Sequence, residues 1–594
     1  MRVRQWHWKW GPFLAQTVAV AVLVCTALEL WRFDFRVQFN YLGDSLWFAL
    51  LAKSVAHNAW AFHVPQLSAP YGLAAAAFPT MTNFDWLIMK AISLIVSDPA
   101  IVFNVFWLCT IFFTAWTGLL SLRLLGVPGW LAALGGLLYT AIPYTWLRST
   151  GHLSLVFYSV PLLCVFAVYL ARGPVDQWKD ATYRRVGLLG ACMQGFQYVY
   201  FSWFAILLFA AAAMLGYVHR RQRQVLVWAA IGIGVLAATS ALNLAPSFYA
   251  WQKHGRPKLD YKTTREAEVY GLKIRRLVLP HEENPILPLR SWAVRDRKAE
   301  FPHENENGSA RLGLFGATGF LLLLSVSLAI RTPQLTPDQT TIRSMAALSL
   351  IVLVVTTVGG FGAIINTLTV PDIRAYNRFS VFLAFYSIAG LSLWLADRWR
   401  ETRDTMKPLV AAAVVGAAAF SLYDQALDAR AITRSYDRDR KVAANVHTVV
   451  AGMEPLFPER TAVFQFPITD FPADFNRGRM LAYDHALPYL RTDHFRWSWP
   501  ALTPRHIGWT RFVKSLGGPA QVRAIADAGF GAIWIDRFGY RDRGRAITAS
   551  ILSAGGVEVL QGISRRYAVI DIRAAAGERD GRGPAVGNPV AGAP

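Results

Sequence analysis

The amino-acid sequence predicts a mainly α-helical polytopic membrane protein of about eleven spans, followed by a small extracytoplasmic α/β domain. The chain of 594 residues is 54% hydrophobic and only 16% charged, whereas soluble proteins carry roughly 25% charged residues. Its charges are gathered between apolar runs that are long enough to cross a bilayer. Towards the C-terminus these runs stop, and short segments typical of β-strands alternate with helical ones.

Apolar runs of about 20 residues, the length that crosses a bilayer as a helix, recur along most of the chain. Segment 186–218 is too long for one ordinary pass. Because both of its flanks are basic, it must hold two passes, which turn near Gln197 to Ser202. The predicted spans are residues 12–31, 99–122, 130–147, 153–171, 186–218 (two passes), 225–247, 312–330, 344–366, 378–396 and 408–423.

The net charge of +22 is spread over short basic clusters between the apolar runs, for example at residues 2–9 and 219–223. Such clusters mark cytoplasmic loops, whereas a protein that binds nucleic acid gathers its basic residues in one patch. We therefore expect no nucleic acid among the partners. The alternation of basic loops places the N-terminus in the cytoplasm and the C-terminal domain outside. The first span lacks a cleavage site and is predicted to be retained as a helix.

The chain divides into a membrane domain at residues 1–423, an outer α/β domain at 424–574 and a Gly/Pro/Ala-rich tail at 575–594, which is predicted to be disordered. Two outer loops of the membrane domain are long, 32–98 and 248–311. Loop 32–98 is predicted to hold two short helices in the membrane interface, at Ser45 to Trp60 and Trp86 to Val96. The outer domain is predicted to have strands at 462–466, 532–535 and 567–572, with some parallel pairing, and helices at 519–528 and 544–554.

Two carboxylates of loop 32–98, Asp44 and Asp85, are the predicted catalytic residues. Asp44 reaches the outer membrane face directly after the first span, in a polar interruption of an apolar chain. Two outer carboxylates can share a site, one as general base and one as an orienting or metal-binding group. Capping of a helix N-terminus is the alternative role for each of them.

Three outer arginines, Arg148, Arg374 and Arg378, are predicted to bind a phosphate. Arg374 and Arg378 precede a span, and an arginine at a helix start opposes the helix dipole. A phosphate bound at that helix start would explain both residues. The alternative is that they extend to the lipid headgroups.

Substrate contacts are predicted for His152, which follows Arg148 and two hydroxyl residues, and for Lys53 and His57 on the helix after Asp44. No motif requires a cofactor. The four cysteines lie in apolar runs and form no metal-binding pattern, and His281-Glu-Glu lacks the spacing of a zinc protease. No metal-binding residues are therefore assigned, and the sequence does not decide whether the protein uses a divalent metal ion.

These features together resemble the GT-C superfamily of polytopic membrane glycosyltransferases. In that superfamily a first span is followed by an outer loop with a catalytic Asp and two interfacial helices, and then by many more spans. Four stretches also resemble the bacterial YfhO-like sugar transferases. They are Gly43-Asp-Ser-Leu…Ala69-Pro-Tyr-Gly72, Gly151-His-Leu…Val160-Pro-Leu162, Glu304-Asn-Glu…Leu312-Gly-Leu314 and Arg374…Asn377-Arg-Phe379.

The resemblance implies a polyprenyl-phosphate monosaccharide as donor, a glycan, lipid or protein as acceptor, and a site at the outer face of a bacterial inner membrane. It implies Asp44 as the general base of an inverting transfer, with Arg374 and Arg378 at the donor phosphate. Two alternatives remain. A transporter or flippase of a lipid-linked sugar would need polar residues near the membrane midplane and repeated halves, and a non-catalytic assembly protein would need no reactive Asp44.

Overall fold

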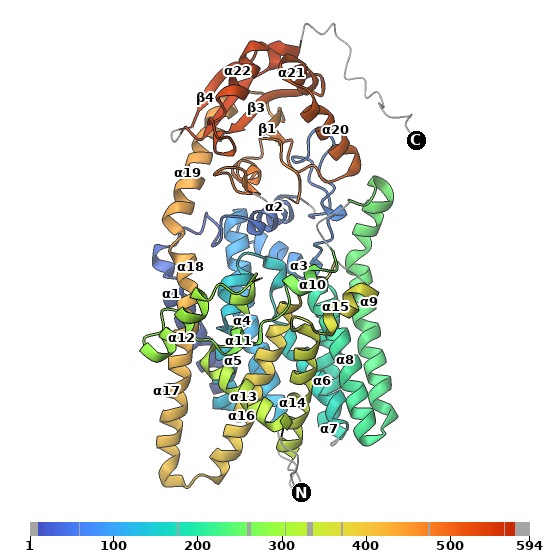
Figure 1. Cartoon of the computed structure of the whole chain (residues 1–594), viewed down its shortest axis with the longest axis vertical. Helices are drawn as coiled ribbons and strands as arrows, with labels where there is room; N and C mark the ends of the chain where they lie inside the picture. The colour runs from blue at the N-terminus through green and yellow to red at the C-terminus, as the bar shows by residue number, and fades with distance from the viewer. Residues whose placement is uncertain are drawn as a thin grey trace.

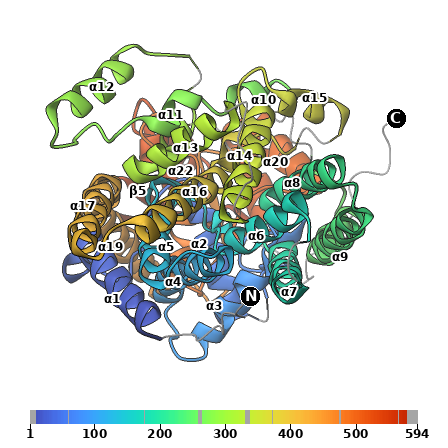
Figure 2. The same ribbon diagram turned by 90° about the horizontal axis from the view of Figure 1, so that it is seen from below.

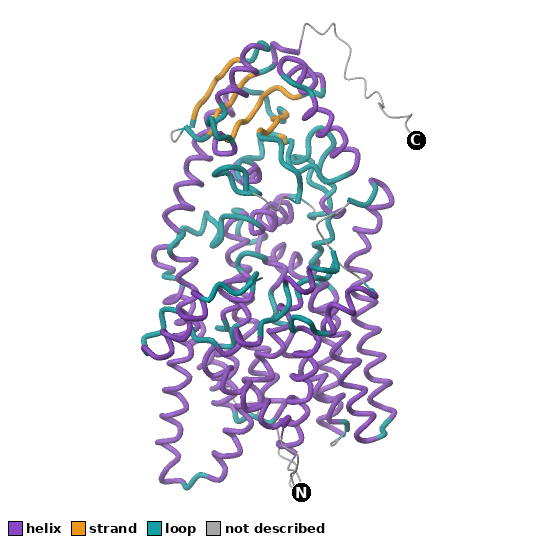
Figure 3. Tube along the Cα trace, in the orientation of Figure 1, coloured by secondary structure: helices purple, strands orange, loops and turns teal. Residues whose placement is uncertain are grey.

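A bundle of long apolar helices makes up the lower part of the molecule, and a small sheet domain stands above one end of it (Figure 1). The computed structural model describes residues 10–58, 60–174, 177–257, 263–302, 304–328, 337–369, 372–472, 476–562 and 565–576. Loops gather in a layer between the bundle and the sheet (Figure 3). The side of the bundle that faces this layer is called the outer side below.

Each predicted span corresponds to one helix of the bundle. Within the described ranges, eight helices are long and apolar enough to cross a membrane. Two others, α5 and α13, are apolar but have only 12 and 16 residues, and α7 is charged in its first half. The bundle consists of α1 (Trp10–Ala27), α4 (Pro99–Leu125), α5 (Gly129–Thr140), α6 (Val160–Arg172), α7 (Gln177–Gly195), α8 (Val199–Arg220), α9 (Arg223–His254), α13 (Gly313–Leu328), α14 (Pro337–Thr356), α16 (Ser380–Glu401) and α17 (Lys407–Ala426).

The ends of α4 show how local sequence sets a span. The Asp98 carboxylate accepts the backbone N–H of Ala100 at 2.8 Å and caps the helix. Pro99 occupies the first turn, where no intrahelical hydrogen bond is lost. Gly126 ends the helix in the left-handed region, at φ 105°.

Small residues let the helices of the bundle approach closely, as is common between helices in lipid. A Cβ on Gly319 of α13 would lie 2.0 Å from the Ser387 carbonyl oxygen of α16. The Gln16 side chain of α1 donates to the carbonyls of Ala115 and Ala133 at 3.1 Å each, which ties α1 to α4 and α5. Van der Waals contact and buried hydrogen bonds therefore both hold the bundle.

The double pass predicted for 186–218 is confirmed, with its turn at residues 196–198. Its polar side chains find protein partners, as lipid surroundings require. The Ser159 hydroxyl donates to Gln194 at 2.6 Å, and the Ser202 hydroxyl donates to the Gln194 carbonyl at 3.1 Å.

Two predicted spans end earlier than expected. The helix predicted for 130–147 stops at Thr140 and is followed by a π-helical turn, Thr145–Ser149, which carries Arg148. The helix predicted for 344–366 stops at Thr356, and a separate short helix α15 (Phe361–Leu368) follows. In both places apolar composition continues after the backbone has turned, so hydropathy alone overestimates the span.

Loop 32–98 contains the two predicted helices, α2 (Asp44–His57) and α3 (Asn83–Ser93). The interfacial position predicted for α2 is wrong, because every residue from Ser45 to Val55 is buried. A helix that is apolar on nearly all sides is stable only when it is enclosed, and α2 lies between the bundle and the sheet domain (Figure 1). The second long loop, 248–311, contains α10 (Glu266–Val269), α11 (Ile274–Val278), α12 (Leu287–Lys298) and the 3₁₀ turn η5 (Asn307–Ala310).

The sheet domain has five strands in the order β2-β1-β3-β5-β4, with β1 parallel to β2 and β3, and β5 antiparallel to β3 and β4. The predicted strands and helices are present. The sequence missed β2, which has two residues, and the largely exposed edge strand β4. The elements are β1 (Ala462–Phe466), β2 (Arg496–Trp497), α20 (Pro504–Ser515), α21 (Gly518–Asp527), β3 (Phe530–Asp536), α22 (Arg545–Ser553), β4 (Val557–Gln561) and β5 (Tyr567–Asp571).

A nearly continuous helical rod connects the bundle to the sheet domain. It runs from α17 through the 3₁₀ turn η8 (Leu427–Ala429), α18 (Arg430–Thr433) and α19 (Tyr436–Met453) (Figure 1). The predicted domain boundary at 424 falls in the last turn of α17, and the sheet begins only at Ala462. The disorder predicted for 575–594 concerns a tail that lies almost wholly outside the described residues.

Candidate active site

Arginines from separate segments meet in the loop layer on the outer side of the bundle. Arg148 and Arg378 both form ion pairs with Glu306, with nitrogen–oxygen distances of 3.0 and 3.2 Å. Arg374 pairs with Glu266 at 2.6 Å. Tyr200 connects the ion pairs of Glu306 with the ion pair of Glu266. Its ring lies 4.6 Å from the Arg378 guanidinium, and its hydroxyl is 3.3 Å from the Arg374 backbone nitrogen.

We call Arg148, Arg374, Arg378 and Glu306 the arginine cluster. The structure thus brings together the three arginines that the sequence predicts to bind a phosphate. Arg148 is far from Arg374 and Arg378 in the sequence, so no local pattern could place it beside them.

Glu306 belongs to the arginine cluster, although the sequence predicts no role for it. It has a left-handed backbone, at φ 55°, which costs a non-glycine residue about 1–3 kcal/mol. Burial alone would raise the pKa of Glu306, but Arg148 and Arg378 outweigh it and lower the pKa. The carboxylate is therefore ionised. The Glu304-Asn-Glu306 string was the only signal for it.

The arginine cluster carries hydrogen-bonding capacity that the described protein groups do not use. Arg148 Nε, the Tyr144 hydroxyl and Asn377 Oδ1 are buried and have no partner in the described part of the chain. Buried polar atoms are almost always paired in folded proteins. Among the described residues, the three arginines of the cluster pair with two carboxylates, Glu266 and Glu306. This arrangement suits an additional anion.

His152 lies between the arginine cluster and α2. Its ring contacts Phe48 of α2 and Tyr198, with ring centroids 4.6 and 5.8 Å apart. Burial and the nearby Arg148 and Arg378 hold the pKa of His152 well below its ordinary value, so the ring is neutral. It can exchange hydrogen bonds with a sugar hydroxyl, but it adds no charge.

Asp44 is exposed at the start of α2 and has no hydrogen bond or ion pair with any described residue. The capping alternative is wrong, since Gly43 is the capping residue and no side chain caps this end. Asp44 stands one helical turn before Phe48, so the two share a face of α2. Just upstream, Asn40 Nδ2 would lie 2.9 Å from a Cβ on Gly151. The segment that carries Asp44 therefore packs on the segment that carries Arg148 and His152.

Asp85 is enclosed in the loop layer. Its carboxylate accepts hydrogen bonds from the hydroxyls of Thr82 and Tyr158 and from Gln197 Nε2, the last two at 2.6 and 3.1 Å. Burial raises the pKa of Asp85 to about 6, although these hydrogen bonds oppose the shift. Asp85 joins α3 to the segment before α6 and to the α7–α8 turn. Its predicted catalytic role stays a prediction, and its contacts are those of a structural tie.

Lys53 and His57 contact the sheet domain, and their predicted contact with substrate stays a prediction. The three donors of the Lys53 ammonium are used by the carbonyls of Tyr489 and Thr492, at 2.6 and 2.8 Å, and by Asp493 at 2.9 Å. His57 Nδ1 lies 3.0 Å from the other Asp493 oxygen. Because an ammonium has only three donors, none remains for a ligand.

Within the described residues, no group of three or more His, Cys, Asp or Glu side chains is placed to hold a metal ion. A divalent cation would therefore need ligands from the substrate phosphate.

No protein-family model and no curated protein matches the chain. Solved structures do. ArnT from Cupriavidus metallidurans bound to undecaprenyl phosphate matches with a TM-score of 0.54 at 11% identity, over 96% of this chain and 100% of ArnT. The oligosaccharyltransferase AglB from Archaeoglobus fulgidus gives a TM-score of 0.46 at 11% identity, over 90% of this chain and 70% of AglB. The arabinofuranosyltransferase AftD from Mycobacteria gives 0.49 at 13% identity, over 96% of this chain and 42% of AftD.

The TM-score and coverage of the ArnT match show the fold. The narrower YfhO-like resemblance stays a prediction. The predicted architecture is confirmed, and this multi-pass membrane protein has the GT-C fold of polytopic membrane glycosyltransferases.

Proposed function

We propose that this protein is a membrane glycosyltransferase that moves a monosaccharide from a polyprenyl-phosphate donor to an acceptor, with Asp44 as general base. The main support is the arginine cluster. Its three arginines pair with two described carboxylates, and buried donors such as Arg148 Nε have no described partner. The cluster also lies beside the chain segment that carries Asp44. The fold supports it as well, since ArnT, which shares that fold, was solved with undecaprenyl phosphate.

The proposed reaction needs one base and one phosphate site. Asp44 takes the proton from an acceptor hydroxyl as the hydroxyl oxygen attacks the anomeric carbon of the donor sugar. The bond between that carbon and the phosphate oxygen breaks, and its electrons stay on the polyprenyl phosphate. Attack opposite the leaving phosphate inverts the anomeric centre.

Arg148 and Arg378 would hold the donor phosphate. A planar guanidinium donates two parallel hydrogen bonds to phosphate oxygens, and such charge-assisted bonds strengthen as negative charge builds on the leaving group. Arg374 adds positive charge four residues before Arg378. His152, neutral and next to both arginines, would contact hydroxyls of the transferred sugar.

The site would face the periplasm or cell exterior of a bacterial inner membrane, with the N-terminus in the cytoplasm. The basic clusters between spans support this orientation. A reporter fused after Ala574 should be active only outside the cytoplasm. Cytoplasmic activity of that reporter would reverse the orientation.

Donor affinity of Arg378 variants tests the proposal. Arg378→Ala should weaken binding of a polyprenyl-phosphate sugar about 10- to 100-fold, the value of one or two charge-assisted hydrogen bonds. Arg378→Lys should recover only part of the loss, because an ammonium cannot form the paired contact. Arg256→Ala removes an arginine that is 64% exposed and serves as the control.

A role of Arg378 in contacting lipid headgroups gives a different result. In that case Arg378→Lys would restore wild-type affinity, because any cation at that depth is sufficient. Unchanged donor affinity in Arg378→Ala would remove this arginine from the donor site.

A further inference from the structure

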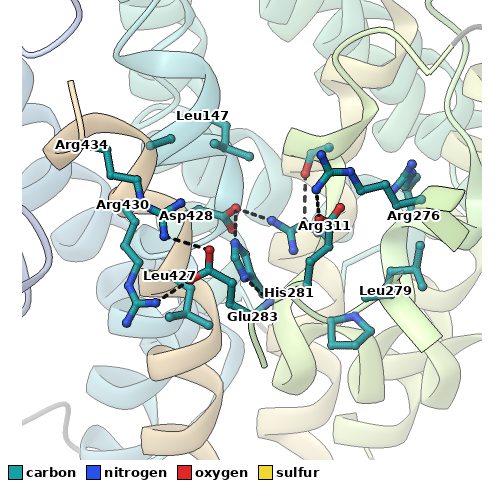
Figure 4. Close-up of a pocket in the computed structure, with 16 residues that line it drawn as sticks. Leu147, Arg276, Leu279, His281, Glu283, Arg311, Leu427, Asp428, Arg430 and Arg434 are labelled. Atoms are coloured by element: carbon teal, nitrogen blue, oxygen red, sulfur yellow. Dashed lines mark hydrogen bonds and ion pairs between the residues drawn. The ribbon is translucent and has the colours of Figure 1, made fainter. Parts of the chain in front are cut away.

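A charged pocket of about 340 Å³ opens next to the arginine cluster. Loop 248–311 forms one wall of it, and the helical rod forms the other with η8 and α18 (Figure 4). The two sites share their dividing wall. Leu147 lines the pocket and immediately precedes Arg148, and Gly308 lines it two residues after Glu306.

Arginines in this pocket exceed the carboxylates that can neutralise them. Five arginines line it, against Glu282, Glu283 and Asp428. Arg297 pairs with Glu282 and Arg311 with Asp428, whereas Arg276 and its neighbour Arg275 share Asp296 and Glu304.

One acid, Glu283, faces two arginines, Arg430 and Arg434. Arg430 Nη1 and Arg434 Nη2 lie 2.5 and 2.9 Å from its two oxygens. One positive charge therefore has no described acid of its own. His281 does not add to it, since burial lowers the pKa of His281 to about 4 and leaves the ring neutral.

The remaining lining is apolar, with Leu147, Leu279 and Leu427 on the walls. A pocket whose arginines are interspersed with leucines fits a molecule that carries an anionic group next to an apolar part (Figure 4). A free ion would use the arginines alone.

The helix α12 gives such a molecule a route from the bilayer. Ala293 and Arg297 of α12 line the pocket, whereas Leu287 and Trp292 do not and are 70% and 47% exposed. The helix projects from the bundle when the molecule is seen from below (Figure 2). Exposed Trp and Leu between basic residues are typical of helices that lie on a membrane surface.

We propose that this pocket binds a phosphate group at a site separate from the donor phosphate, and that a membrane lipid carries this group. Arg430 and Arg434 hold the phosphate, because their guanidinium groups can exchange their shared Glu283 oxygens for phosphate oxygens. The apolar walls hold the glycerol and the start of the acyl chains. The site does not depend on the proposed transfer reaction.

The test measures thermal unfolding of the purified full-length protein in non-ionic detergent, without donor or acceptor. The probes are dioctanoyl phosphatidylglycerol, dioctanoyl phosphatidylcholine and inorganic phosphate. The double variant Arg430→Gln/Arg434→Gln removes the two phosphate contacts. Its charge-matched control is Arg438→Gln/Arg440→Gln on the next part of the rod, where both side chains are more than half exposed.

Phosphatidylglycerol should raise the Tm of the wild type and of the control in a saturable way. The apparent affinity should fall about 10- to 100-fold in Arg430→Gln/Arg434→Gln, and phosphatidylcholine should have a smaller effect on all three proteins. The same selective loss seen with inorganic phosphate alone would support the phosphate site and overturn the lipid as its source. Equal Tm shifts in the two double variants, or no shift in the wild type, would overturn the proposal. Neither result would touch Asp44 or donor binding.

Discussion

The two ends of α2 differ in a way that separates a candidate catalytic group from a structural one. At the N-terminal end, Asp44 is exposed and no described residue pairs with it. At the C-terminal end, Lys53 is buried and all three of its donors are used. Both ends carry charge, and the sequence predicts a site role for both. A charged group is available for chemistry only when the fold leaves its hydrogen bonds unfilled.

The largest expected effect is on turnover at the N-terminal end. Asp44→Asn should lower the transfer rate about 10²- to 10⁴-fold, because the amide cannot accept the acceptor's proton. The Tm should stay at the wild-type value, since no contact is lost. Asp34→Asn, in the same loop, is the control. Full turnover by Asp44→Asn would exclude Asp44 as the base.

The next effect is on stability at the C-terminal end. Lys53→Met removes the donor to two carbonyls and to Asp493, and should lower the free energy of unfolding by about 1–3 kcal/mol. The turnover of the folded fraction should change little. Lys441→Met, at an exposed position of the rod, should leave the Tm unchanged. A Lys53→Met protein with wild-type Tm and lost substrate affinity would restore the substrate-binding role.

A smaller effect should depend on pH. Its hydrogen bond to Asp493 raises the pKa of His57 above 6.5, and the bonds from His57 and Lys53 hold the pKa of Asp493 below 3.8. The His57 contribution is complete below pH 6.5 and fades as the pH rises through the raised pKa. The Asp493 contribution is complete above pH 3.8 and is lost as the pH falls through the lowered pKa.

The contact should therefore stabilise the protein most between about pH 4 and pH 6.5. The Tm gap between wild type and His57→Gln should be wider at pH 5.5 than at pH 8.5. A gap that is the same at both values would mean that the charge of His57 does not contribute.

Asp85→Asn should have the smallest effect on turnover, within a few-fold of the wild type. Since burial raises the pKa of Asp85 to about 6, the wild type loses stability as the pH rises from 3.8 through 6. The amide does not ionise, so the Tm of the variant relative to the wild type should rise over that interval. A 100-fold loss of turnover would instead support the predicted catalytic role.

Most of the fold can be predicted from the sequence, because the bilayer sets both the length of the apolar spans and the side on which basic loops lie. The double pass at 186–218 follows from two basic flanks alone. The enclosure of α2 could not be predicted this way. It depends on a domain more than 400 residues later in the chain, whose Tyr489 and Thr492 meet Lys53.

Part of the candidate site can be predicted from the sequence, namely its arginines, whereas Glu306 cannot. Arg148, Arg374 and Arg378 stand out, because cations at the outer ends of spans need anionic partners. Glu306 does not stand out in a loop full of mixed charge. Its role follows from a left-handed backbone and two ion pairs, which only the folded chain reveals.

The helical rod has a mechanical consequence. Its stretch of 53 residues from Asp404 to Leu456 is about 80 Å long at 1.5 Å per residue. Only the lower part, α17, belongs to the helix bundle. A spanning helix changes its tilt when the membrane becomes thicker or thinner. Because the rod continues α17 into the sheet domain, we expect a few degrees of tilt of α17 to shift that domain by several ångströms unless its contacts with α2 hold it in place. The contacts of Lys53 and His57 with Asp493 would then resist changes in membrane thickness.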